Sequence, residues 1–273
     1  MKTLKDHIIL YDAECPMCKL YTSALTKTGM LASNGRASYQ DMPEAACAYV
    51  DRQRAVNEIA LVNTKTGEVK YGIHSLFEVI SNSLPVFKGL FLFKPFIWLM
   101  SKVYAFISYN RRVIIPTDIN NENDIQPAFK LKYRVAYLLF TWAMVGFILT
   151  SYAKLLTGFI PAGNSYREYL ICGGQIIFQG IIVSIYAPAK RWDYLGNMMT
   201  ISFAGALLLA PMLLVAHFVN IVPIIYPLYF MAIAGLMFLE HIRRAKLLHL
   251  GWMLTISWVI YCIIVLLLIL NFK

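Results

Sequence analysis

The sequence predicts two units: an α/β domain at the N-terminus, followed by an all-α bundle of about five transmembrane helices. Of the 273 residues, 59% are hydrophobic and 15% are charged, whereas a soluble domain is about 45–50% apolar and about 25% charged. The charges are also uneven, because residues 1–130 hold 15 of the 25 basic and 12 of the 15 acidic residues. This composition excludes an ordinary soluble protein, a disordered chain and a small disulfide scaffold.

The charge distribution places the domain boundaries. We expect an α/β domain over 1–116, a linker over 117–130 and a transmembrane domain over 131–273. The linker is predicted because Thr117–Ala128 is polar and aperiodic. No targeting peptide is expected, since the first apolar run, Ile8–Tyr11, is shorter than the roughly 7–15 residues of a signal sequence.

Five apolar runs in the second half each approach the ~20 residues that a spanning helix needs. They cover 133–153, 169–188, 195–218, 222–239 and 250–270. Only a few residues separate the third run from the fourth, which predicts a tight hairpin. Alternate loops carry eight and three basic residues, so the positive-inside rule predicts an N-terminal domain in the cytoplasm and a C-terminus outside. We therefore expect a multi-pass protein of a bacterial inner membrane.

Polar residues within these runs are candidates for function, because they are costly in lipid. Cys172, Gln175 and Gln179 share one face of the second predicted helix. The simpler interpretation is interhelical packing with hydrogen bonds. The alternative is a quinone pocket that includes Gln175, Gln179 and His217. Glu240, His241 and His249 are expected at a solvated helix end, with haem ligation by the two histidines as an alternative.

The first half has the periodicity of an α/β domain. A continuous apolar run at 7–11 predicts a buried strand, and Pro16 opens a helix that reaches Gly29. Further strands are expected at 35–40, 58–63 and 68–71, with helices at 41–56 and 73–81. The resulting order, βαβαββα, with a Cys-x-x-Cys after the first strand, is that of a thioredoxin-like core.

Residues 84–109 are aromatic and apolar but contain two prolines, Pro85 and Pro95, that break any single long helix. We expect helices that pack on the core or lie at the membrane surface. A re-entrant or sixth spanning segment is the alternative.

Cys15 and Cys18 form the Cys-x-x-Cys pair. A zinc site would need about four ligands, and neither the single Cys47 nor the histidines at 7 and 74 provide a second pair, so no metal is expected. A structural disulfide is unexpected in a domain that faces a reducing compartment. A redox-active dithiol remains, and it needs no further cofactor.

The spacing predicts different roles for the two thiols. Cys15 at the helix N-terminus has a lowered pKa and is the exposed attacking thiol, whereas Cys18, one turn in, is the resolving thiol. Asp12 accepts a proton, orders the turn or caps the helix. Glu14 opposes formation of the thiolate beside it.

The stretch Ile9-Leu10-Tyr11-Asp12-Ala13-Glu14-Cys15-Pro16-Met17-Cys18 resembles the opening of the DCC family of thiol–disulfide oxidoreductases, named for its Asp-x-x-Cys-x-x-Cys signature. Gly72 and the aromatic-rich tail that ends in Tyr109-Asn110-Arg111-Arg112 are also similar to that family, so the resemblance covers about 6–115. It implies a thioredoxin-like fold and dithiol chemistry at Cys15 and Cys18, with Asp12 as the third signature residue. The chain departs from thioredoxins proper at 54–58, where it has no proline before the third strand.

The leading functional hypothesis is a membrane-anchored thiol–disulfide oxidoreductase that acts on a thiol or disulfide protein or small molecule. The alternatives are transmembrane electron transfer, through quinone or through Cys172 and Cys262, and a transporter or complex subunit with a redox-sensing domain. The expected surroundings are the lipid bilayer. No nucleic acid is expected despite the net charge of +10, since no basic cluster with interleaved aromatics occurs. The sequence leaves the oligomeric state open.

Overall fold

The computed structural model describes residues 2–42, 49–55, 57–117 and 128–271. Cys47, residues 43–48 and 56 of the helix expected at 41–56, and most of the expected linker lie outside the described residues. In the described part of 41–56, only residues 52–55 are helical. The chain divides into two compact units, which we call the N-terminal unit (1–133) and the membrane unit (134–273). The N-terminal unit extends past the expected linker because the start of α7 belongs to it. There Tyr133 stacks on Tyr109, and its carbonyl accepts a hydrogen bond from Asn110 Nδ2 at 3.0 Å.

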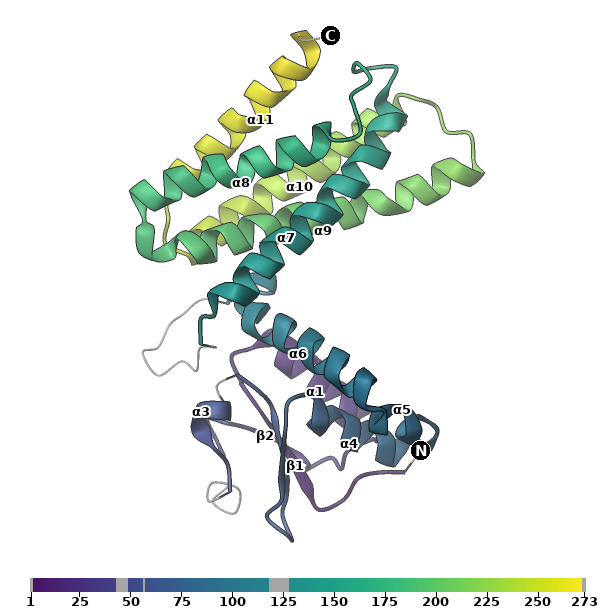
Figure 1. The fold of residues 1–273 in the computed structure, drawn as a ribbon, viewed down its shortest axis with the longest axis vertical. Coiled ribbons are helices and arrows are strands. Elements are labelled where there is room, and N and C mark those ends of the chain that lie inside the picture. Colours follow the sequence, from purple (N-terminus) through teal and green to yellow (C-terminus); the bar gives the residue numbers. More distant parts are fainter. Residues whose placement is uncertain (1, 43–48, 56, 118–127, 272–273) are drawn as a thin grey trace. The chain divides into compact units, whose positions relative to one another are not determined.

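The N-terminal unit contains a four-stranded mixed sheet in the order β2-β1-β3-β4 (Figure 1). The strands are β1 (His7–Tyr11), β2 (Arg36–Ser38), β3 (Ala60–Asn63) and β4 (Val69–Tyr71). β1 pairs in parallel with β2, with Ile9 beside Arg36, and antiparallel with β3, with Ile8 beside Val62. β3 and β4 are antiparallel neighbours. All four predicted strands are therefore present; β1 has the expected bounds and the other three are shorter than expected.

Helices cover both faces of this sheet. On one face, Ile9 and Leu61 pack with Leu25 of α1 (Pro16–Lys27) and Val79 of α4 (Ile73–Ser83). On the other face, Leu10, Ala60 and Val62 pack against Val50 and against Ala55 of the short helix α3 (Arg52–Ala55). The two central strands, β1 and β3, alternate between these two clusters, as the two-residue period of a strand requires. The loop that carries Cys15 and Cys18 follows the central strand β1.

The aromatic segment after α4 forms a short 3₁₀ turn (Pro85–Phe87), then α5 (Lys88–Leu92) and α6 (Lys94–Ile114). Pro85 and Pro95 occupy the first positions of their helices, so the predicted break occurs, and the two parts meet at 89°. α6 packs on the domain core through Tyr104.

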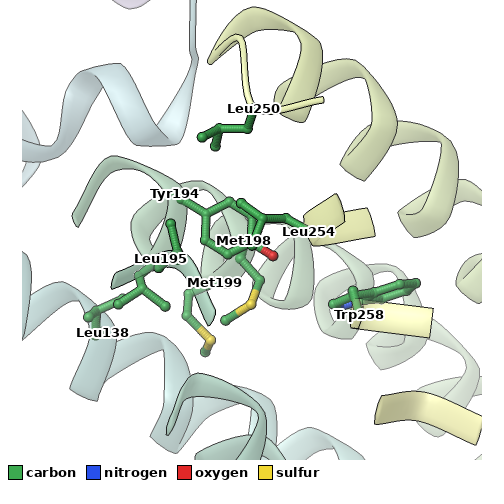
Figure 2. Packing of buried hydrophobic residues seen from close by; sticks show 9 residues of the cluster. Leu138, Tyr194, Leu195, Met198, Met199, Leu250, Leu254 and Trp258 are labelled. Carbon is green, nitrogen blue, oxygen red and sulfur yellow. The ribbon is translucent and has the colours of Figure 1, made fainter. Parts of the chain in front are cut away.

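The membrane unit has five helices that are long and apolar enough to cross a bilayer. They are α7 (Leu131–Ala153), α8 (Arg167–Tyr186), α9 (Arg191–Phe218), α10 (Ile225–Leu247) and α11 (Met253–Asn271). The predicted count of five spans is confirmed for the described residues, and the chain is a multi-pass membrane protein. α9 and α10 pack together along the hairpin that follows Phe218. Figure 2 shows the centre of this bundle, where Met198 and Met199 of α9 lie with Leu254 and Trp258 of α11.

Candidate functional site

The candidate site is the turn that joins β1 to α1. β1 is buried at Ile9 and Leu10, which anchors its end inside the sheet. Pro16 then takes the first position of α1, where its missing N–H costs no hydrogen bond. These two local features hold the residue between them, Cys15, at the N-cap of α1.

Cys15 caps the helix with its sulfur. Its backbone is extended, with φ −89° and ψ 107°, and its Sγ accepts a hydrogen bond from Cys18 N at 3.3 Å. The backbone N of Cys15 donates in turn to Asp12 O at 3.2 Å. The helix N-terminus therefore points unpaired N–H groups at the Cys15 sulfur, which favours its thiolate form.

The two thiols are shifted in opposite directions. The pKa of Cys15 is lowered from 9.0 to about 6, chiefly because the Cys18 side chain hydrogen-bonds to its sulfur, with the Cys18 N–H and the Arg111 charge adding to the effect against the cost of burial. The pKa of Cys18 is raised, because its side chain hydrogen-bonds to Cys15 and because it is buried. One thiol is thus prepared as the nucleophile while its neighbour keeps its proton.

Both sulfurs are buried, with Cys15 2% exposed and Cys18 4% exposed. The expectation of an exposed attacking thiol is wrong for this conformation. The reason is local, since the Cys15 side chain turns back over the first turn of α1 to cap it.

Asp12 joins the turn to the rest of the unit. It is 1% exposed, and its Oδ1 accepts from Glu14 N at 3.0 Å and from Gln40 Nε2 at 3.2 Å. Its Oδ2 accepts from Arg111 Nη2 at 3.1 Å. Asp12 therefore orders the turn, which is one of the three roles expected for it. It does not cap α1, because Cys15 occupies that position.

Arg111 is the functional residue that the sequence did not identify. It lies on the last turn of α6, 5% exposed and 99 residues from Asp12. Arg112 lies next to it, with Nη2 at 3.9 Å from a carboxylate oxygen of both Asp12 and Glu14. The only signal in the sequence was the Tyr109-Asn110-Arg111-Arg112 stretch, to which no role could be assigned. Packing of α6 on the sheet brings this positive charge to the dithiol.

A second polar cluster lies within the membrane unit. Gln179 Oε1 of α8 accepts from Tyr194 Oη of α9 at 2.9 Å and from Ser257 Oγ of α11 at 3.2 Å. His241 of α10 connects to it, with Nε2 at 3.2 Å from Tyr194 Oη and Nδ1 at 3.0 Å from Thr255 Oγ1. These bonds tie four helices together, which agrees with the packing interpretation of Gln179.

Several expectations for the membrane unit are corrected by this cluster. His241 is 2% exposed rather than placed at a solvated helix end. Its burial is tolerated because the hydroxyls of Tyr194 and Thr255 form hydrogen bonds with its two ring nitrogens. His217 is exposed at the far end of α9, 23 residues or roughly 35 Å from Tyr194. The structure therefore does not bring Gln175, Gln179 and His217 together into the expected quinone pocket.

In the described part of the chain, the cysteines form neither a metal cluster nor a disulfide. Among the described residues no group of three or more His, Cys, Asp or Glu side chains is arranged to hold a metal ion. Cys15, Cys18, Cys172 and Cys262 are all free thiols. Comparison with protein-family models, with curated proteins and with solved structures gave no match.

Proposed function

We propose that the chain is a membrane-anchored thiol–disulfide oxidoreductase in which Cys15 attacks and Cys18 resolves. The position of Cys15 carries this proposal, because its sulfur caps α1 and accepts a hydrogen bond from Cys18 N. The opposite directions of the two pKa shifts agree with it. Attack on a disulfide needs a thiolate, and a low pKa provides one at neutral pH. The resolving thiol has to stay protonated until the mixed disulfide forms, as a raised pKa ensures.

The reaction conserves electrons within the two cysteines and the substrate. Cys15 Sγ attacks one sulfur of a substrate disulfide, forms a mixed disulfide and releases the other sulfur as a thiolate. The Cys18 thiol then transfers its proton to the released substrate thiolate and attacks Cys15 Sγ, which releases the second substrate sulfur as a thiolate. The substrate gains two electrons and the chain is left with a Cys15–Cys18 disulfide. A dithiol reductant completes the cycle by the reverse exchange.

Two side chains prepare this step. The Arg111 guanidinium stabilises the Cys15 thiolate electrostatically, and Asp12 holds Arg111 in place through a buried ion pair. Because Cys15 is buried, a local change in conformation has to expose its sulfur before a substrate disulfide reaches it.

The topology supports a thioredoxin-like fold. The strand order β2-β1-β3-β4, with β3 antiparallel to β1, places α1 and α4 on one face and α3 on the other. It agrees with the fold implied by the resemblance to the DCC family at Asp12, Cys15 and Cys18. The excess of basic residues in alternate loops supports a cytoplasmic location for this domain in a bacterial inner membrane.

Disulfide trapping with the full chain in detergent tests the proposal. A Cys18→Ser variant should accumulate a stable mixed disulfide with a substrate disulfide, because Cys15 attacks but nothing resolves the product. A Cys15→Ser variant should form none and lose turnover. Cys262→Ser is the matched control and should behave as the unaltered chain, since Cys262 lies in α11 of the membrane unit. Full turnover by Cys15→Ser would refute the proposal.

A further inference from the structure

Six apolar side chains of the N-terminal unit are exposed within a short stretch, from the 3₁₀ turn before α5 to the first half of α6. We call them the docking face: Val86, Leu90, Leu92, Phe93, Trp98 and Leu99. Val86 is 84% exposed, Leu92 68% and Trp98 64%. So many large exposed apolar side chains on one short segment favour an interaction site over an ordinary surface.

Stacked aromatic rings pack α5 and α6, which carry the docking face, against α4. Phe91 of α5 stacks on Phe77 of α4 with ring centroids 4.2 Å apart, and Phe96 of α6 lies 5.8 Å from Phe77. Figure 1 shows α4, α5 and the start of α6 lying together in this way. The exposed residues therefore do not fold back to cover one another.

The opposite side of α6 is bound to the domain core, so α6 does not cross a membrane. Tyr104 Oη accepts from Ile59 N at 3.1 Å, Ser108 Oγ donates to Asn57 O, and Arg111 pairs with Asp12. A spanning helix would have to give up these contacts. An amphipathic helix that lies in the interface keeps them and buries only its outer side.

The charge on the docking face identifies its partner as anionic. Lys88, Lys94 and Lys102 lie along it, and the sequence contains no acidic residue between Glu78 and Asp118. Lys102 Nζ lies 5.8 Å from the ring centroid of Trp98. Tryptophan beside lysine is typical of a segment at the headgroup level of a bilayer.

The membrane unit offers no charge to match these lysines. It has three acidic residues, each paired with an arginine of its own: Glu168 with Arg167, Asp193 with Arg134 and Glu240 with Arg243. A second copy of the chain would bring lysine against lysine across a two-fold axis. The partner has to accept apolar side chains and to carry negative charge. A bilayer with anionic lipids does both, because its interior is apolar and its headgroups are negative.

The chain itself keeps the docking face near a bilayer. Tyr133, in the first turn of α7, stacks on Tyr109 near the end of α6, and Trp98 lies 11 residues or roughly 17 Å from Tyr109 along the same helix. We infer that the docking face inserts into the headgroup region of the membrane that holds α7, and that anionic lipids strengthen this contact.

The test uses the full chain in lipid nanodiscs with one copy per disc. Discs contain either phosphatidylcholine alone or roughly one third phosphatidylglycerol, with lipids brominated near the headgroup. The contribution of Trp98 is the difference in quenching between the chain and its Trp98→Phe variant. We expect strong quenching of Trp98 in the anionic discs and weak quenching in the neutral discs.

Charge reversal provides the second arm. Lys88→Glu, Lys94→Glu and Lys102→Glu together should weaken docking by on the order of 100-fold and remove the quenching of Trp98. The matched control reverses Lys5, Lys19 and Lys27, which are exposed elsewhere on the same unit, and should leave the quenching unchanged.

Three results would overturn the inference. Trp98 unquenched in both kinds of disc means that lipid does not cover the face. Trp98 shielded equally in a lipid-free amphipol indicates that the membrane unit covers it. Shielding that appears only in discs with two copies indicates a dimer.

Discussion

Cys15 and Cys18 differ in the surroundings of their sulfur atoms, and these surroundings shift the pKa of the two thiols in opposite directions. Cys15 Sγ accepts hydrogen bonds at the N-cap of α1, and Arg111 adds a positive charge nearby. Cys18 lies one turn further in, where burial and the charge of Cys15 disfavour its thiolate. Two identical side chains therefore have separate roles within a single helical turn.

The first prediction concerns the pH dependence of Cys15. Only the thiolate reacts with iodoacetamide, and it is the form present above the pKa. Alkylation of Cys15 should therefore rise to half its maximum near pH 6, the pKa given by its surroundings. Mass spectrometry of the peptide that contains Cys15 measures the rate, and the Cys15→Ser chain is the blank. A midpoint near that of an ordinary thiol would contradict the prediction.

The second prediction concerns the buried ion pair of Asp12 and Arg111, which are 2% and 5% exposed at their side chains. Arg111→Met removes the closer of the two arginines that pair with Asp12 and leaves only Arg112 at 3.9 Å, so it should destabilise the N-terminal unit by up to about 3–5 kcal/mol. It should also move the midpoint of Cys15 alkylation upward, because one of the charges that stabilise the thiolate is gone. Cys18 is buried in the folded unit, so the urea concentration at which its thiol becomes reactive measures the stability of the N-terminal unit.

The double variant Asp12→Asn with Arg111→Met is the control for this pair. It removes both charges together and should cost less than Arg111→Met alone. If the double variant is instead as unstable as the sum of the two single variants, the ion pair is not coupled.

At the scale of elements, α6 performs two tasks on opposite sides. Its inner side supplies Tyr104 to the core and Arg111 to the dithiol, and its outer side carries Trp98 and Leu99 of the docking face. The helical repeat makes this division possible, because residues three and four apart share a side. A single helix thus connects the surface inferred to meet lipid with the charge beside Cys15.

The helices of the membrane unit are joined by side-chain hydrogen bonds rather than by apolar packing alone. Gln179, Tyr194 and His241 come from three different helices, and Thr255 adds the fourth. Since the Tyr194 hydroxyl donates to Gln179, the proton of neutral His241 lies on Nε2. Such bonds matter in a bundle because lipid tails provide no hydrophobic force between helices.

The third prediction compares two histidines of this unit. His241→Leu removes the hydrogen bonds to the buried Tyr194 and Thr255 hydroxyls, so it should destabilise the bundle by about 1–2 kcal/mol. His217→Leu is the matched control and should have little effect, because His217 is exposed. Thermal unfolding in detergent measures both. Equal loss in the two variants would show that the cluster does not stabilise the bundle.

At the scale of the whole molecule, the five candidate spans predict how the chain crosses the membrane. Five crossings would put the N-terminal unit and the C-terminus on opposite sides. The basic loops predict that the N-terminal unit is on the cytoplasmic side.

The fourth prediction tests this topology with reporters fused to the C-terminus of the full chain. Alkaline phosphatase, which is active only outside the cytoplasm, should be active there, and a cytoplasm-dependent fluorescent reporter should be dark. The opposite result would mean an even number of spans or an inverted orientation.

Much of the fold was predictable because its signals are local. Apolar runs of about 20 residues mark α7 to α11, and short β-branched runs mark β1 and β3. Pro85 and Pro95 mark the starts of their helices. The positions of Cys15 and Cys18 followed equally from Pro16 and the strand before it. The burial of Cys15 was not predictable from the sequence, because an N-cap sulfur is able to turn toward the helix or toward solvent.

The sequence by itself determined which half of the chain faces water, which half faces lipid, and where the dithiol lies. Composition, run length and cysteine spacing are properties of neighbouring residues, so they need no tertiary structure. Only the tertiary structure decided which charge meets the thiols and which histidine is buried. Arg111 lies 99 residues from Asp12, and His241 lies 47 residues from Tyr194. Contacts of that range depend on how α6 packs on its sheet and how α10 packs on α9, and no local pattern encodes that packing.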